Sequence, residues 1–127
     1  MTRILVVDDD PRTAVSFART LELKGYQVTT VSDAEAGLRA AAASNLAYDG
    51  MILDLRMPGV DGLALLRRLR NTPRYQNMPV VVVTGDYLID DQTVTELGQL
   101  GAVVRFKPLW LDDLVEVART FAGTPVA

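Results

Sequence analysis

Short apolar runs alternate with segments of helical periodicity along this chain. Runs rich in β-branched residues predict strands over residues 4–7, 28–31, 51–53, 80–83 and 102–106. Between these runs, apolar residues recur every three or four positions. This spacing predicts helices over residues 11–24, 33–44, the segment after Asp61, 90–100 and 111–122. The pattern therefore predicts five repeats of a strand followed by a helix.

Residues at the ends of these segments support their boundaries. Pro11 suits a first helical turn, and Gly25 and Gly101 suit the position just after a helix. Asp10 is expected to cap the first helix, Ser32 or Asp33 the second, and Asp61 the third. Pro58 and Gly62 are expected to be turn residues. The inward faces are predicted from the apolar spacing: Val15, Ala18 and Leu21 in the first helix, and Val94, Leu97 and Leu100 in the fourth.

The predicted strands are continuously apolar rather than alternating. Such strands are typical of a sheet covered on both faces, which is usually a parallel sheet. Right-handed crossovers then give a doubly wound α/β sandwich. In such a sheet, functional residues gather at the carboxyl ends of the strands.

Composition narrows the chemistry that is possible. The 127 residues suit one domain, and the chain has neither cysteine nor histidine. Disulfides, thiolate metal sites and a histidine base are therefore excluded. The net charge of -3 argues against a nucleic-acid or anionic-membrane surface. With no apolar run long enough for a bilayer and no signal-peptide pattern, we expect a cytoplasmic protein.

Strong polar residues follow four of the five predicted strands. Asp8, Asp9 and Asp10 follow the first strand, Asp54 the third, Thr84 the fourth and Lys107 the fifth. Two carboxylates about 4 Å apart repel by roughly 4 kcal/mol at an effective dielectric constant of about 20. Because a whole domain is stable by only about 5–15 kcal/mol, converging carboxylates need a bound cation, or one of them must stay protonated. Oxygen ligands without histidine or cysteine favour Mg²⁺, and together with Thr84 and Lys107 they suit phosphoryl transfer to a carboxylate.

Four motifs carry a family resemblance: residues 4–10 (ILVVDDD), 52–62 (ILDLRMPGVDG), 83–85 (VTG) and Lys107-Pro108. In order and spacing they resemble the marker motifs of response-regulator receiver domains, chemotaxis-regulator-like, over residues 2–122. The resemblance implies a flavodoxin-like fold, with a five-stranded parallel sheet of order 2-1-3-4-5 and five helices. We expect the receiver domain to span residues 1–123, with a tail at 124–127 and no output domain in this chain.

The resemblance also implies a role for each matching residue. Asp54 is the expected phosphoacceptor, Thr84 binds the phosphoryl group and moves on activation, and Lys107 pairs with the phosphate. The peptide bond between Lys107 and Pro108 is typically cis in the family. The expected Mg²⁺ ligands are Asp54, Asp9 directly, Asp8 mainly through water, and the backbone carbonyl of Arg56.

A signalling role follows from the same resemblance. A sensor histidine kinase or histidine phosphotransferase is expected to phosphorylate Asp54 with Mg²⁺. The signal then alters the surface of the fourth strand, fourth helix and fifth strand, and an output protein or a second copy binds there or on the fifth helix. We expect no enzymatic turnover beyond self-phosphorylation from a donor and slow self-dephosphorylation, and no direct contact with nucleic acid or membrane.

The sequence departs from the family pattern at the switch position. The family usually has Tyr or Phe three residues before the lysine, whereas this chain has Val104. Phe106 and Tyr87 are candidate substitutes, although both also read as packing residues. Arg56 and Asp86, two residues beyond Asp54 and Thr84, are expected to modulate phosphate lifetime, and we hypothesise that they pair across the mouth of the site.

Two other functions remain open from the sequence. Asp8-x-Asp10, Thr84 and Lys107 mimic the order found in haloacid-dehalogenase-like phosphohydrolases, but the 54–62 motif then has no explanation. The missing aromatic at Val104 gives some weight to a receiver-like interaction module that is never phosphorylated.

Overall fold

The structure is a computed structural model that describes residues 1–43, 45–55, 62–85 and 88–121. Its elements, in chain order, are β1 (Arg3–Val7), α1 (Pro11–Leu23), β2 (Gln27–Val31), α2 (Ala34–Ala43), β3 (Gly50–Asp54), α3 (Gly62–Arg70), the short 3₁₀ helix η1 (Pro73–Tyr75), β4 (Val80–Thr84), α4 (Asp91–Gln99), β5 (Ala102–Phe106) and α5 (Leu111–Phe121).

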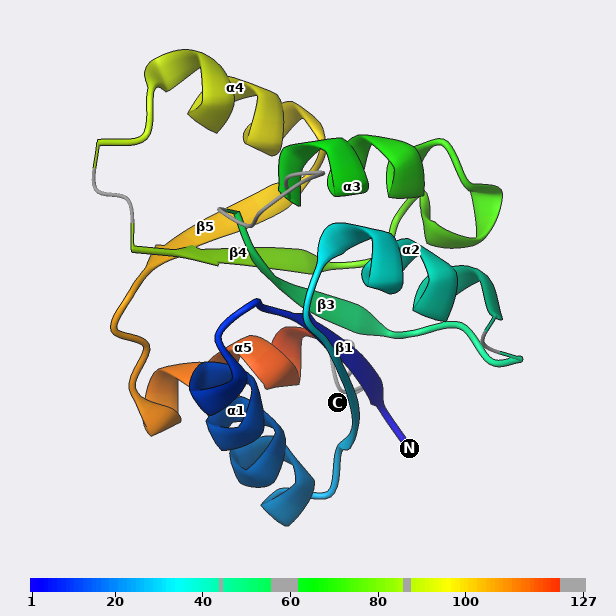
Figure 1. The fold of residues 1–127 in the computed structure, drawn as a ribbon, viewed down its shortest axis with the longest axis vertical. Coiled ribbons are helices and arrows are strands. Elements are labelled where there is room, and N and C mark those ends of the chain that lie inside the picture. The colour runs from blue at the N-terminus through cyan, green and yellow to red at the C-terminus, as the bar shows by residue number, and fades with distance from the viewer. Residues whose placement is uncertain (44, 56–61, 86–87, 122–127) are drawn as a thin grey trace, which may run out of the picture.

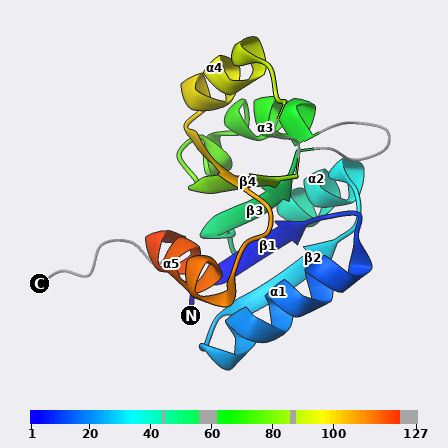
Figure 2. The ribbon, with the colours of Figure 1, turned by 90° about the vertical axis from the view of Figure 1, so that its left-hand side faces the viewer.

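The five strands form one parallel sheet in the order β2-β1-β3-β4-β5. Helices α2, α3 and α4 lie on one face, and α1 and α5 lie on the other (Figure 1). The view turned by 90° shows the same two helical layers on either side of the strands (Figure 2). The doubly wound fold and strand order expected from the sequence are confirmed.

The three inner strands explain why the apolar runs are continuous. All residues of β3 and β4 are buried, and successive side chains enter opposite cores: Leu53 packs with α2 and α3, and Ile52 packs with α1 and α5. Full burial of one such side chain stabilises the fold by about 1.5–3 kcal/mol. The edge strands β2 and β5 are more exposed, as their mixed polar sequences require.

Helix α1 is rotated relative to the prediction. It buries Ala14, Phe17 and Leu21, whereas Val15 is 50% exposed and Ala18 is only partly buried. Two apolar stripes run along this helix, and the larger Phe17 side chain lies on the buried one. In α4 only Leu97 of the predicted stripe is fully buried, and Val94 is 42% exposed.

Aspartates cap the described helix starts as the sequence suggests. The side chain of Asp10 accepts a hydrogen bond from the backbone N–H of Arg12, and that of Asp33 accepts one from Ala36. The proposed cap Asp61 lies outside the described residues. Gly25 and Gly101 have positive φ angles of 94° and 76°, which explains glycine after α1 and α4.

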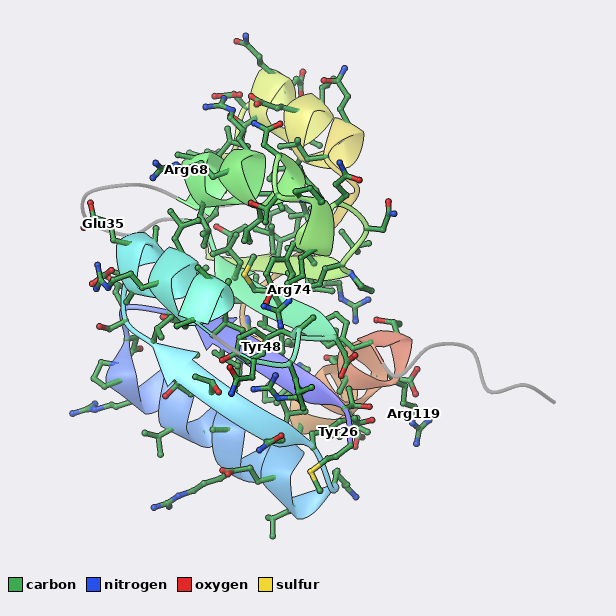
Figure 3. All side chains as sticks on the ribbon, turned by 90° about the vertical axis from the view of Figure 1, so that its right-hand side faces the viewer. Tyr26, Glu35, Tyr48, Arg68, Arg74 and Arg119 are labelled. Carbon is green, nitrogen blue, oxygen red and sulfur yellow. The ribbon has the colours of Figure 1, made fainter. Side chains whose placement is uncertain are left out.

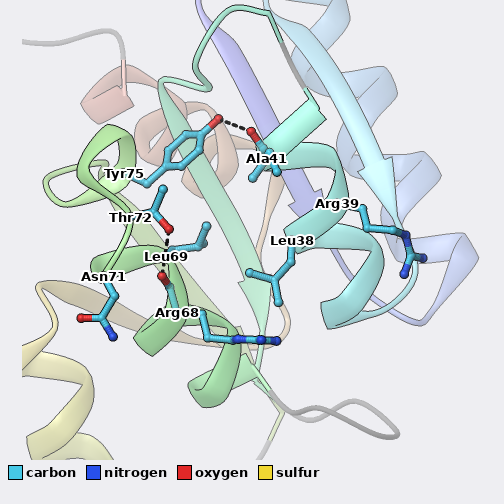
Figure 4. Close-up of a pocket in the computed structure, with 9 residues that line it drawn as sticks. Leu38, Arg39, Ala41, Arg68, Leu69, Asn71, Thr72 and Tyr75 are labelled. Atoms are coloured by element: carbon cyan, nitrogen blue, oxygen red, sulfur yellow. Dashed lines mark hydrogen bonds between the residues drawn. The ribbon is translucent and has the colours of Figure 1, made fainter.

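The helix η1 was not predicted, and it brings Tyr75 beneath α2. The hydroxyl of this buried tyrosine donates a 2.9 Å hydrogen bond to the backbone carbonyl of Ala41, as Figure 4 shows. The C-terminal end of α2 is thereby tied to the segment after α3. No helix in the described part of the chain has both the length and the apolar character needed to cross a membrane.

Candidate functional site

The carboxyl ends of four strands bring the predicted site residues to one edge of the sheet. Asp54 and Thr84 are the last residues of β3 and β4. Asp8 follows β1 directly, and Lys107 follows β5 directly. Parallel pairing places Asp54 opposite Val83, one residue before Thr84. The register of the sheet therefore gathers side chains that lie far apart in the sequence.

Three carboxylates converge at this edge. Asp8, Asp9 and Asp54 each offer an oxygen, and these oxygens all lie within 4.8 Å of one another. Asp8 and Asp54 are only 4% and 8% exposed, whereas Asp9 is exposed. One carboxylate oxygen of Asp8 accepts a 2.9 Å hydrogen bond from the backbone N–H of Asp10, which helps to fix its direction. The cluster thus has two buried members and one open to solvent.

Lys107 places a positive charge against the two buried carboxylates. Its Nζ lies 3.5 Å from Oδ2 of Asp8 and 3.4 Å from Oδ2 of Asp54. Burial by itself would lower the pKa of Lys107, but the charges of Asp54 and Asp8 outweigh this and hold the pKa above its usual value. The lysine is therefore charged at neutral pH, and it bridges β1 and β3.

The backbone also fixes Lys107 relative to Thr84. The backbone N–H of Lys107 donates a 2.8 Å hydrogen bond to the carbonyl of Thr84. Thr84 is fully buried. The Lys107–Pro108 peptide bond is cis, as the family resemblance implied. The ends of β4 and β5 thus form one unit beside the carboxylates.

The residues present suit a hard divalent cation. Three carboxylates face a single described lysine, so the cluster carries surplus negative charge. Carboxylate oxygens are the protein ligands that Mg²⁺ prefers. Asp8, Asp9 and Asp54 could hold such an ion, and the charge of the ion would offset their mutual repulsion.

The side chain of Asp10 has a different role from those of Asp8 and Asp9. Its two carboxylate oxygens accept hydrogen bonds from the backbone N–H of Arg12 and the hydroxyl of Thr13. These bonds lower the pKa of Asp10, and the hydroxyl of Thr13 makes the largest contribution. Asp10 is therefore the helix cap expected from the sequence, and it is not a member of the group formed by Asp8, Asp9 and Asp54.

The other predicted site residues lie either outside the described part of the chain or in β5. Arg56, Asp86 and Tyr87 lie outside the described residues, and so does the hypothesised Arg56–Asp86 contact. Val104 is partly buried and packs against the core beneath α2, α3 and α4. Phe106 pairs directly with Thr84 in the sheet and is 43% exposed.

Gly62 has a role that its sequence reading as a turn residue missed. A Cβ atom here would lie 2.8 Å from the backbone oxygen of Asp54 and 3.0 Å from Cα of Leu55. Its backbone N–H donates to the carbonyl of Leu55. Only glycine lets the start of α3 approach the strand end so closely. The Asp-Gly pair after Asp54 was the available sequence signal.

A separate groove of about 520 Å³ lies between α2 and the end of α3, as Figure 4 shows. Its lining includes Leu38, Leu69 and Tyr75, and contains none of the predicted site residues. This groove is therefore separate from the charged cluster at the strand ends.

Known proteins resemble this chain in sequence. The sequence profile of the response regulator receiver domain matches residues 4–119. The transcriptional activator protein PfeR of Pseudomonas aeruginosa is 40% identical over 82 residues, which cover 65% of this chain and 25% of PfeR. The transcriptional regulatory protein PrrA of Mycobacterium tuberculosis is 35% identical over 114 residues, which cover 89% of this chain and 46% of PrrA. This chain therefore spans less than half the length of either relative.

A solved structure agrees with these sequence matches. The CheY-like receiver domain protein from Methanospirillum hungatei superposes with a TM-score of 0.85 at 27% identity, covering 96% of this chain and 94% of that one. The profile match, the relatives and the fold lead to the same assignment. The chain belongs to the response regulator receiver domain family.

Proposed function

We propose that this chain is a phosphoacceptor switch of a two-component pathway, with Asp54 as the residue that receives the phosphoryl group. One observation carries the proposal: Asp54 shares an oxygen cluster with Asp8 and Asp9, and Lys107 bridges Asp54 and Asp8. The phosphoryl donor is a phosphohistidine of a sensor kinase or histidine phosphotransferase in the cytoplasm, which is the partner class that the family implies.

The proposed reaction is a transfer between a nitrogen and a carboxylate oxygen. An Oδ atom of Asp54 forms a bond to phosphorus while the phosphorus–nitrogen bond of the donor breaks. The electron pair of that bond stays on the imidazole nitrogen, which then takes a proton from solvent. The chain needs no histidine of its own for this step, in keeping with its composition.

The chain's own groups position and neutralise the transferred phosphoryl group. Lys107 would exchange its contact with the Asp54 carboxylate for a charge-assisted hydrogen bond to a phosphoryl oxygen. The Thr84 hydroxyl would donate a second such bond. Asp8, Asp9, Asp54 and the backbone carbonyl of Arg56 would hold Mg²⁺, which when bound supplies charge neutralisation around the transferred group.

The output of the switch is a change in the surface formed by β4, α4 and β5. We propose that a phosphorylated chain presents this surface, together with α5, to an output protein or to a second copy. PfeR and PrrA are named as transcriptional proteins and are longer than this chain, so any contact with DNA would belong to segments beyond the receiver domain. Turnover is limited to slow loss of the phosphoryl group.

Beryllofluoride tests this proposal because it mimics a phosphoryl group on a carboxylate. The single tryptophan, Trp110, lies three residues after Lys107 and serves as the fluorescence probe. With Mg²⁺, beryllofluoride should change the fluorescence of the wild-type protein and leave that of Asp54→Asn unchanged. A wild-type protein that does not respond would contradict the proposal and favour a receiver-like module that is never phosphorylated.

A further inference from the structure

Helix α4 is poorly stabilised by its own sequence. Its nine residues, Asp91–Gln99, include Gly98 and three consecutive β-branched residues at 93–95. Glycine and β-branched residues are weak helix formers. Packing adds little, because Leu97 is the only residue of α4 that is fully buried. The position of α4 therefore depends on contacts that neighbouring elements supply.

Helix α3 supplies such contacts to the C-terminal half of α4. Arg67 donates through Nε and Nη2 to the two carboxylate oxygens of Glu96, and the Nη2 bond is 2.6 Å long. One turn further along α3, Arg70 donates through Nε to the carbonyl of Leu100 at 2.7 Å. The first contact is a two-bond fork between charges, and the second caps the end of α4.

The two arginines hold α4 with different strengths. Arg70 is partly buried and also donates through Nη1 to the carbonyl of Tyr75 at 2.8 Å, so its position is fixed from two sides. The Arg67 and Glu96 side chains are 52% and 31% exposed. Because water competes for exposed charges, the Arg67–Glu96 pair can open at little cost. Arg70 thus fixes one end of α4, and Arg67–Glu96 is the contact that can open.

Helix α4 is also the first helix in the chain after Thr84, a residue of the candidate site. Strand β4 ends at the buried Thr84, and α4 begins seven residues later at Asp91. A displacement of Thr84 toward a bound phosphoryl group, which the family resemblance implies, would be passed along the chain to α4. An interaction that favours the present position of α4 opposes such a displacement, since a ligand must bind the displaced state more tightly to populate it.

We infer that the Arg67–Glu96 pair is a latch that holds α4 in its unphosphorylated position and so weakens the response of the site to a phosphoryl group. This inference rests on the proposed function. It assigns to two residues outside the carboxylate cluster control over how readily that cluster is occupied. Arg67 and Glu96 are positioning residues, since neither takes part in the proposed chemistry.

The test compares beryllofluoride affinity, in the presence of Mg²⁺, among full-length variants followed by Trp110 fluorescence. Glu96→Gln should bind beryllofluoride about two- to fivefold more tightly than wild type, the range expected for loss of one exposed ion pair. The charge-swapped variant Arg67→Glu/Glu96→Arg should return toward wild-type affinity. Glu116→Gln is the matched control, because Glu116 pairs with Arg119 at 3.2 Å on the outer side of α5, where Figure 3 shows Arg119.

The outcomes separate the latch from the proposed function. If wild type responds and Glu96→Gln has unchanged or weaker affinity, the latch is wrong while the proposed function stands. The latch is also wrong if Glu116→Gln gains as much affinity as Glu96→Gln. If wild type itself gives no response, the proposed function fails, and the latch fails with it. Urea unfolding of each variant shows whether a change in affinity accompanies general destabilisation.

Discussion

At the scale of single residues, the candidate site is a balance of opposed charges. Lys107 offsets part of the repulsion among the carboxylates, but it contacts Asp8 and Asp54 and not Asp9. The exposed Asp9 therefore contributes repulsion without a described cationic partner of its own. A divalent ion removes that repulsion, so the stability of the fold and the binding of the ion are linked at this residue.

Asp9→Asn should separate these two effects. Without Mg²⁺ the variant should be as stable as wild type or slightly more stable, by up to about 1 kcal/mol, because one repulsive charge is gone. With Mg²⁺ it should gain less stability than wild type, because a ligand is lost. Urea unfolding with and without Mg²⁺ measures both. Glu22→Gln, an exposed change outside the cluster, is the control, and an undiminished Mg²⁺ response of Asp9→Asn would contradict the assigned site.

The pairing of Glu96 predicts a pH dependence of stability. The hydrogen bond from Arg67 holds the pKa of Glu96 below its usual value in the folded protein. The resulting stabilisation is fully present above the pKa of an unfolded glutamate, about 4.3, and is lost as the pH falls through the lower folded-state pKa. The difference in urea midpoint between wild type and Glu96→Gln should therefore be largest near neutral pH and should disappear in acid.

The control for that measurement repeats the comparison in proteins that carry Arg67→Ala. In an Arg67→Ala background, the further change Glu96→Gln should have little effect on the midpoint at either pH. A difference between wild type and Glu96→Gln that is constant from neutral to acid pH would show that Arg67 does not perturb Glu96.

The positions of Asp8, Asp54, Thr84 and Lys107 at the strand ends were predicted from the sequence, whereas the inward face of α1 was not. Aspartates at strand ends and a capping aspartate have local causes, so Asp8, Asp54 and Asp10 could be assigned from their positions alone. Val15 was wrongly placed inside, because α1 carries two apolar stripes and only tertiary packing chooses the one with Phe17. The contacts of Arg67 and Arg70 with α4 were not predicted, because their partners lie about thirty residues away along the chain.

At the scale of elements, strand continuity and helix periodicity predicted all five strands and all five helices, with ends displaced by a few residues. Strand β2 begins one residue before its predicted start, since β1 pairs with Gln27 as well as Val28. Helix η1 was missed because three residues carry too little periodicity to be recognised. It nevertheless matters, since Tyr75 connects the ends of α2 and α3.

Two glycine substitutions test how elements are stabilised. Gly98 lies inside α4, and an added Cβ would meet nothing within 4 Å. Gly98→Ala should therefore stabilise the protein by up to about 1 kcal/mol, the difference in helix propensity. Gly50 lies under the ring of Phe121, where a Cβ would come within 2.1 Å of Cγ. Gly50→Ala should destabilise by about 1–3 kcal/mol through overpacking.

Thermal or urea unfolding of the two variants checks these opposite signs. A destabilised Gly98→Ala protein would mean that α4 needs its glycine for a reason other than local conformation. A Gly50→Ala protein as stable as wild type would mean that α5 can shift away from β3 without cost.

At the scale of the whole molecule, the sheet brings four distant segments to one edge. The apolar pattern predicted parallel strands, and parallel strands place their carboxyl ends together, so the composition of the site followed from the fold class. The change that phosphorylation makes in the surface of β4, α4 and β5 could not be predicted from the fold class. Val104 removes the family's usual aromatic, and the α3–α4 contacts become visible only when both helices are placed on the sheet.

Covalent phosphorylation of Asp54 tests the central claim most directly. The protein is incubated with Mg²⁺ and a phosphorylated histidine kinase or small-molecule phosphodonor, and the modified residue is then mapped by mass spectrometry. The account predicts one phosphoryl group on Asp54 of the wild-type chain, dependent on Mg²⁺, and none on Asp54→Asn. Phosphorylation mapped to Asp8, or transfer that proceeds equally well in Asp54→Asn, would contradict it.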